Sequence, residues 1–186
     1  MRIISGYLKG RKLLQPESDV TRPLKDLTKE SIFNIIQHSG LVKKSFDKIS
    51  VLDFFAGIGS FGLECVSRGS RNIKFFENHP QAIKILEKNI INLKCEDCVE
   101  VLKTDILKIQ DFQSYFDKKF EIIFMDPPYK ENNTNLILNK IINSKILKRN
   151  GIIIIHRHKK SKDLFPKKFN IMKVKNYGIS KIIFGN

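Results

Sequence analysis

From about residue 49 onward, short apolar runs alternate with segments whose apolar residues recur at helical spacing. Strands are predicted at 50–55, 72–77, 99–105, 120–126 and 151–156, and helices at 60–69, 79–93 and 135–147. The last of these strands contains four consecutive isoleucines, as expected of a strand buried on both faces. Because strands alternate with helices, we predict an α/β fold with a doubly wound, mostly parallel sheet.

The two ends of the chain show different patterns. Residues 169–186 form two β-rich runs around a glycine, which predicts an antiparallel hairpin at one edge of the sheet. Residues 2–14 resemble a short β-hairpin with several basic side chains, and residues 26–37 predict a helix. We therefore expect a small N-terminal extension, residues 1–40, packed on one core domain, residues 41–186.

The chain is strongly basic, with 34 Lys and Arg against 19 Asp and Glu and a formal net charge of +15. Such an excess favours a polyanionic partner, usually nucleic acid. Alternatively, the excess of basic residues reflects a compositional bias of the coding genome, because Lys, Ile and Asn are all abundant. Three sparse cysteines do not make a disulfide framework or a zinc site, and no apolar run approaches a membrane span. We therefore expect a cytoplasmic protein without a metal and without a membrane partner.

A glycine-rich turn, Asp53-Phe-Phe-Ala-Gly-Ile-Gly-Ser-Phe-Gly62, follows the first predicted strand. Its GxGxxG spacing is shared by sites for NAD and for S-adenosylmethionine (SAM). Asp53 favours SAM, because a carboxylate there would repel a pyrophosphate but suits the cationic amino-acid end of SAM. Alternatively, Asp53 only caps the next helix or forms the turn. Glu77 ends the second strand, where a carboxylate can bind the ribose of either cofactor.

A second motif, Asp126-Pro-Pro-Tyr129, stands at the end of the fourth strand, where open α/β sheets bind ligands. The Asp126 carboxylate and the Pro127 carbonyl are two fixed acceptors, and Tyr129 offers a ring for stacking. Two such acceptors can hold both N–H groups of an exocyclic amine and aim the nitrogen lone pair at the methyl group of SAM. The motif predicts methyl transfer to a base amine; the alternative is a rigid loop with a capping aspartate.

The glycine-rich turn resembles the SAM-binding motif of class I, Rossmann-like methyltransferases, and the second motif is similar to the (D/N)PP(Y/F) motif of enzymes that methylate base amines. The stretches at 2–13, 21–36, 53–69 and 177–185 resemble the RsmD family, which methylates N2 of a guanine in bacterial small-subunit ribosomal RNA. The resemblance spans nearly the whole chain. It implies SAM as cofactor, ribosomal RNA within an assembling 30S subunit as partner, and a monomeric enzyme.

The resemblance also implies roles for individual residues. The SAM site would comprise Asp53, Ala56, Gly57, Gly59, Glu77 and, near the adenine, Asp105. The target guanine would be held by Asp126, Pro127 and Tyr129, and RNA phosphates would be contacted by Arg11, Lys12, Arg22 and Lys29. The chain departs from the family where Leu27 and Lys29 replace arginines and where His156 stands in place of a common glutamate. We therefore assign His156 no catalytic role and expect a solvated basic loop at 156–160.

Three other functions stay open at this stage. A base amino-methyltransferase acting on adenine N6 of DNA or RNA would use the same motifs, although a DNA enzyme usually carries a separate recognition domain. An NAD-dependent dehydrogenase would leave the second motif without a role. A non-catalytic RNA-binding assembly factor on the same fold would show degraded motifs, and both motifs here are intact in form.

Overall fold

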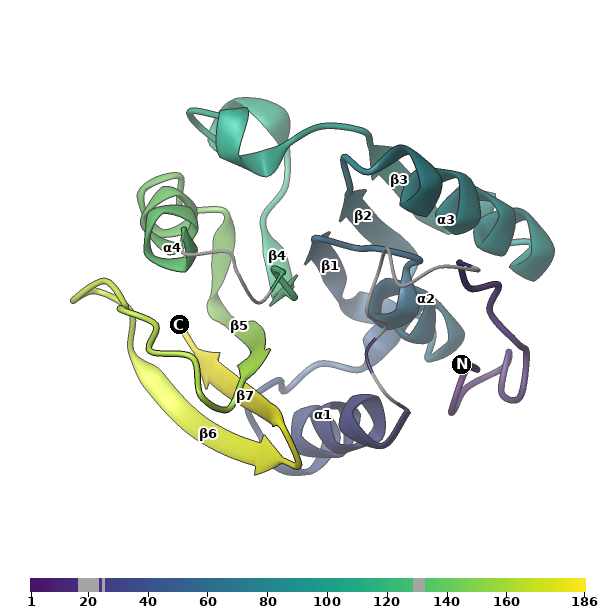
Figure 1. Cartoon of the computed structure of the whole chain (residues 1–186), viewed down its shortest axis with the longest axis horizontal. Coiled ribbons are helices and arrows are strands. Elements are labelled where there is room, and N and C mark those ends of the chain that lie inside the picture. Colours follow the sequence, from purple (N-terminus) through teal and green to yellow (C-terminus); the bar gives the residue numbers. More distant parts are fainter. Residues whose placement is uncertain (17–23, 25, 129–132) are drawn as a thin grey trace.

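The computed structural model describes residues 1–16, 24, 26–128 and 133–186. A seven-stranded sheet crosses the molecule, and helices cover both of its faces (Figure 1). The strands are β1 (Ser50–Phe54), β2 (Asn72–Phe76), β3 (Val99–Leu102), β4 (Phe120–Met125), β5 (Leu147–His158), β6 (Ile171–Tyr177) and β7 (Ser180–Gly185). The helices are α1 (Asp26–His38), α2 (Ser60–Ser67), α3 (Pro80–Leu93) and α4 (Thr134–Asn143). Within these ranges, no helix is both long and apolar enough to cross a membrane.

The sheet has the order β3-β2-β1-β4-β5-β7-β6. Strands β1 to β5 pair in parallel, and β7 and β6 are added antiparallel at one edge. The chain moves outward from β1 to β3 and then crosses back to place β4 on the other side of β1. This is the predicted class I, Rossmann-like methyltransferase fold with its antiparallel C-terminal hairpin, and the prediction is therefore confirmed.

Alternate side chains of the central strands enter two separate cores. In β1, Val51 belongs to the core that contains α1, α2 and α3, whereas Leu52 belongs to the core that contains α4. The same alternation runs along β4 and β5. Since both faces of these strands are covered, their sequences are continuously apolar, as the isoleucine run indicates.

Strand β5 continues past its predicted end. His156 and Arg157 are 5% and 2% exposed, and both pair with β7. The prediction of a solvated basic loop at 156–160 is therefore wrong for these two residues. The physical reason is the antiparallel partner β7, which extends the sheet beyond the apolar part of β5.

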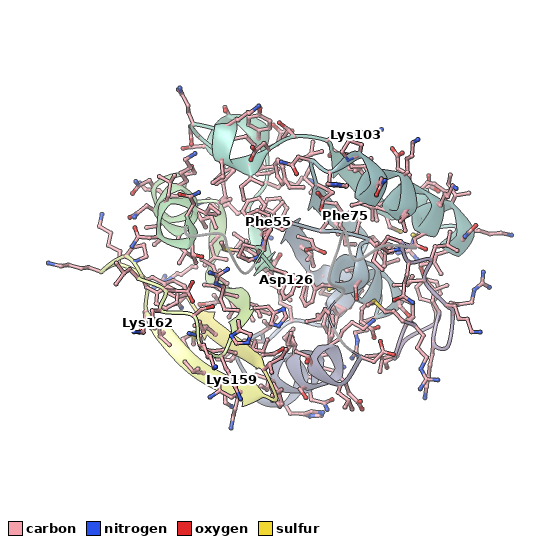
Figure 2. The ribbon with its side chains drawn as sticks, viewed as in Figure 1. Phe55, Phe75, Lys103, Asp126, Lys159 and Lys162 are labelled. Carbon is pink, nitrogen blue, oxygen red and sulfur yellow. The ribbon has the colours of Figure 1, made fainter. Side chains whose placement is uncertain are left out.

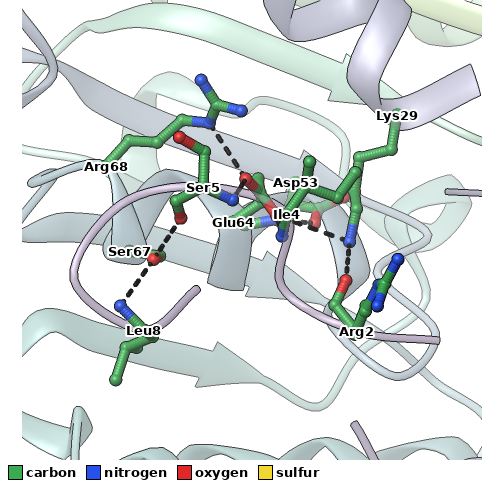
Figure 3. A network of polar contacts seen from close by, with 10 residues as sticks. Arg2, Ile4, Ser5, Leu8, Lys29, Asp53, Glu64, Ser67 and Arg68 are labelled. Carbon is green, nitrogen blue, oxygen red and sulfur yellow. Dashed lines mark hydrogen bonds and ion pairs between the residues drawn. The ribbon is translucent and has the colours of Figure 1, made fainter. Parts of the chain in front are cut away.

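The hairpin predicted at 2–14 is reduced to one β-bridge, between Arg2 and Lys12. This N-terminal segment lies against α2 (Figure 3). Its end is also held by α3, because the Asn89 side chain accepts the Leu14 N–H at 2.7 Å. The division of the chain at residue 40 stays a prediction.

The contact with α2 centres on Glu64, whose side chain is 0% exposed. Its carboxylate accepts the N–H groups of Ile4 and Ser5 at 2.8 and 3.0 Å. The same carboxylate pairs with the cations of Lys29 and Arg68 at 3.5 and 3.0 Å. The N-terminal segment is therefore fixed to α2 by a buried charge with several partners (Figure 3).

Strand β6 forms the outer edge of the antiparallel hairpin. Three of its apolar side chains, Ile171, Met172 and Val174, are between 43% and 46% exposed. Lys173 and Lys175 alternate with them along the strand. This edge therefore combines exposed apolar surface with positive charge.

Candidate active site

The carboxyl ends of β1, β2 and β4 lie side by side. The Asp126 N–H donates to the Phe54 carbonyl at 3.3 Å and joins the end of β4 to the end of β1. The Ala56 N–H donates to the Phe76 carbonyl at 2.9 Å and joins the glycine-rich turn to β2. The strand order reverses between β1 and β4, which is the position where open α/β sheets bind ligands. The fold thus brings the two sequence motifs together.

The three glycines of the turn have different roles. Gly57 has a φ of +56°, and a Cβ added there would meet nothing within 4 Å. A Cβ on Gly59, whose φ is +84°, would lie 2.5 Å from the Leu86 side chain. A Cβ on Gly62 would lie 2.2 Å from the Phe75 ring, so glycine there lets α2 approach the sheet closely. Of the three, Gly57 is the one that leaves space for a ligand beside its backbone.

Glu77 is fixed by backbone donors at the end of β2. Its Oε2 accepts the Gly57 N–H at 2.7 Å, and its Oε1 accepts the N–H groups of Asn78 and His79 at 2.9 Å each. The side chain is half-buried. A carboxylate has about four lone-pair sites and three are used here, so Glu77 Oε2 can still accept one hydrogen bond from a ligand's hydroxyl group.

Asp105 and Ala56 lie at the borders of the same region. Asp105 caps a short 3-10 helix, since its Oδ1 accepts the Leu107 N–H at 2.9 Å. It follows β3, whose last residue Leu102 accepts the Glu77 N–H at 3.3 Å. Ala56 is 8% exposed. Their predicted contacts with a cofactor stay predictions.

Asp53 is 1% exposed and caps α2, because its Oδ2 accepts the Gly62 N–H at 3.0 Å. The capping role considered as an alternative is therefore present, and a direct contact with a ligand stays a prediction. Burial raises the pKa of Asp53 well above its ordinary value, and the carboxylates of Asp126 and Glu77 raise it further. A nearby cation would favour the ionised form of Asp53.

Replacing Asp53 by asparagine is expected to raise the free energy of unfolding. Because the pKa of Asp53 is higher in the folded state, its contribution to stability is lost as the pH rises through that folded-state pKa. Asparagine keeps an acceptor for the Gly62 N–H and does not ionise. Urea denaturation at about pH 5 and about pH 8 should show that the gain of Asp53→Asn grows with pH. A gain that shrinks with rising pH would contradict this assignment.

Asp126 lies at the end of β4 with its side chain 19% exposed, near the middle of the molecule in the view of Figure 2. Its Oδ1 is 2.8 Å from His156 Nδ1, and His156 Nε2 is 2.9 Å from Ser180 Oγ. Pro127 is buried. Tyr129 lies outside the described residues, and its predicted stacking role stays a prediction.

Sequence reasoning missed two residues of β5 that hold this motif. His156 contacts the Asp126 carboxylate, and Arg157 donates from Nη1 to the Pro128 carbonyl at 3.1 Å. Arg157 also pairs with Asp163 at 2.7 Å. The available signal was the predicted C-terminal hairpin, whose second strand is long enough to pair with β5 as far as His158.

Two of the predicted RNA-contacting residues lie on the surface. Arg11 and Lys12 are exposed, and Arg11 Nη2 donates to the Asn92 carbonyl at 2.9 Å. Arg22 lies outside the described residues. The predicted phosphate contacts of these three residues stay predictions.

Lys29 requires a correction. Its side chain is 0% exposed, and its Nζ lies 2.8 Å from the Arg2 carbonyl oxygen and 3.5 Å from Glu64 Oε2. Burial lowers the pKa of Lys29, and the Glu64 carboxylate opposes that shift. The prediction that Lys29 contacts RNA is wrong, because its ammonium group is enclosed between the N-terminal segment and α2.

Comparison with known proteins gives consistent matches over the whole chain. The sequence model of a family described as "Conserved hypothetical protein 95" matches residues 1–186. Ribosomal RNA small subunit methyltransferase D of Haemophilus influenzae is 31% identical over 183 residues, which cover 96% of this chain and 90% of that protein. The protein of the same name from Buchnera aphidicola subsp. Acyrthosiphon pisum is 33% identical over 173 residues, which cover 93% and 86%. A crystal structure of a Haemophilus influenzae protein matches with a TM-score of 0.75 and 28% identity, over 99% of this chain and 96% of that one.

Proposed function

The chain belongs to the RsmD family, and on that basis we propose that it transfers a methyl group from SAM to the N2 amine of a guanine in small-subunit ribosomal RNA. The names of the relatives support ribosomal RNA as the substrate. The observation that carries the proposed chemistry is the position of Asp126, a partly exposed carboxylate beside the glycine-rich turn at the point where the strand order reverses.

The residues present fit SAM as the cofactor. Gly57 has open space beside its backbone, and Glu77 is held next to it as a hydrogen-bond acceptor. The carboxylates of Glu77 and Asp126 lie near the buried Asp53 in a chain of formal net charge +15. Such a site favours a cationic cofactor and disfavours the pyrophosphate of NAD, which argues against a dehydrogenase. When bound, SAM supplies a methyl group on a positively charged sulfur.

The residues of the second motif would orient the base. The Asp126 carboxylate would accept one N–H of the exocyclic amine, the Pro127 carbonyl would accept the other, and Tyr129 would stack on the ring. Held in this way, the amine nitrogen keeps its lone pair available for attack. Orientation and a fixed electrostatic environment then supply the rate acceleration.

Basic surface residues would bind the RNA. Arg11 and Lys12 lie in the N-terminal segment, and Lys159, Lys160 and Lys162 are exposed after β5, where Figure 2 shows Lys159 and Lys162 beside the antiparallel hairpin. Binding through such residues should weaken steeply as the salt concentration rises. The target guanine would have to leave its stack to reach Asp126, at a cost of a few kcal/mol.

Transfer of labelled methyl groups tests this proposal. The substrates are small ribosomal subunits from cells lacking the enzyme, naked small-subunit RNA and duplex DNA, each followed by nucleoside analysis. We expect N2-methylguanosine in subunits or RNA, and a stabilisation of the chain by about 2.7 kcal/mol when SAM is present at 100 times its Kd.

Other products would identify the alternatives. Formation of N6-methyladenine in DNA or RNA would agree with the proposed site but contradict guanine as the target base. Stabilisation by SAM with no label in any substrate would favour a non-catalytic assembly factor. Stabilisation by NADH rather than SAM would overturn the cofactor.

A further inference from the structure

His156 connects three strands at the base of the candidate site. It lies on β5, its ring is almost completely buried, and both ring nitrogens lie within hydrogen-bond distance of a partner. Nδ1 reaches Asp126 Oδ1 at the end of β4, and Nε2 reaches Ser180 Oγ at the start of β7. Ser180 is itself 5% exposed. The C-terminal hairpin therefore contacts, through Ser180, the same histidine ring that contacts Asp126.

The chemistry of these groups sets a direction for the hydrogen bonds. An ionised carboxylate only accepts, so the imidazole must donate from Nδ1 to Asp126. In the neutral ring Nε2 is then an acceptor, and the Ser180 hydroxyl can donate to it. The chain of hydrogen bonds thus runs from Ser180 through His156 to Asp126. It holds one carboxylate oxygen of Asp126 and fixes the tautomer of the ring.

On the basis of the methyl-transfer function proposed above, we propose that His156 is a positioning residue for Asp126. By holding Oδ1, it turns Oδ2 of Asp126 toward the base amine, and Ser180 keeps the imidazole in the donating tautomer. A glutamate at position 156, common in the family that the sequence resembles, would be an acceptor when ionised and would repel Asp126. In this chain, the N–H donor of the His156 imidazole therefore orients the Asp126 carboxylate.

The test compares two substitutions of similar size. His156→Asn keeps an N–H donor at the δ position, whereas His156→Leu has the same branching and no donor. Single-turnover methyl transfer at saturating SAM and RNA should fall by about 100-fold in His156→Leu, the loss expected when a reacting group is misplaced by about 1 Å. His156→Asn should stay within about tenfold of the wild-type rate, and Ser180→Ala should lie between the two.

Readouts other than activity separate positioning from folding. The dissociation constant for SAM and the melting temperature should differ little between His156→Leu and His156→Asn, because both remove the link to Ser180. Nitrogen-15 NMR of the imidazole in the ligand-free protein should show a proton on Nδ1, and the Nδ1 signal should shift in Asp126→Ala.

Equal rates in an active wild type and in His156→Leu would overturn the inference, and so would equally slow His156→Leu and His156→Asn variants. An Nδ1 signal unaffected by Asp126→Ala would also overturn it. A wild-type chain that transfers no methyl group to any substrate would instead overturn the proposed function, so the two failures are distinguishable.

Discussion

Replacing Asp126 by alanine is expected to slow methyl transfer by at least about 100-fold while SAM affinity changes by less than about tenfold. The reason is that Asp126 lies at the end of β4 and is partly exposed, whereas the candidate cofactor contacts come from β1, the turn that follows it, and the segments after β2 and β3. Removing a preorganised partner of the reacting group costs about 100- to 1000-fold in rate. Single-turnover assays and calorimetric titration with SAM measure the two quantities.

Asp126→Asn is the matched control. It keeps the size and one acceptor but loses the charge, so its rate should lie between those of the wild type and Asp126→Ala. Asparagine keeps an acceptor for His156 Nδ1 and alanine does not, so the comparison separates the loss of the charge from the loss of the contact with the ring. Retention of more than about a tenth of the wild-type rate in Asp126→Ala would exclude the role proposed for this residue.

Replacing Glu64 by leucine is expected to lower the free energy of unfolding by about 3–5 kcal/mol, the usual cost of breaking a buried ion pair by removing one partner. The substitution would leave the enclosed Lys29 cation without its carboxylate (Figure 3). It would also leave the N–H groups of Ile4 and Ser5 without their acceptor. Urea denaturation followed by circular dichroism gives the difference directly.

Two further variants test whether burial of the Glu64–Lys29 ion pair causes the expected loss of stability. The double replacement Glu64→Leu with Lys29→Leu removes both charges and should recover part of the lost stability. The ion pair between Lys103 and Glu87 is 55% and 41% exposed, so Glu87→Leu should change stability by no more than about 1 kcal/mol. Equal losses for Glu64→Leu and Glu87→Leu would refute the distinction between the buried and the exposed pair.

Local pattern was sufficient to predict the central sheet and the meeting of the two motifs. Strands buried on both faces have continuously apolar sequences, so β1, β4 and β5 can be identified without knowledge of their partners. Parallel strands end at the same edge of a sheet, so Asp126 and Glu77 could be expected beside the glycine-rich turn. These features depend on short stretches of sequence.

Burial of charged residues depends on partners far away along the chain and could not be predicted in this way. Lys29 stands in a basic stretch, and nothing local indicates that Glu64 encloses it. His156 is buried because β7, whose Ser180 is 24 residues further on, pairs with β5 and contacts the histidine ring. Residues that follow an apolar run look like a surface loop until their pairing partner is known.

The exposed edge of β6 has a consequence for the behaviour of the protein in solution. An edge strand presents backbone groups that a second copy of the chain can pair with, and Ile171, Met172 and Val174 would favour such pairing. Lys173 and Lys175 oppose it, because two such edges repel each other. At 0.1 M salt, the repulsion between exposed charges more than about 10 Å apart is largely screened. Raising the ionic strength should therefore weaken binding to a polyanion and, at the same time, strengthen self-association through the β6 edge.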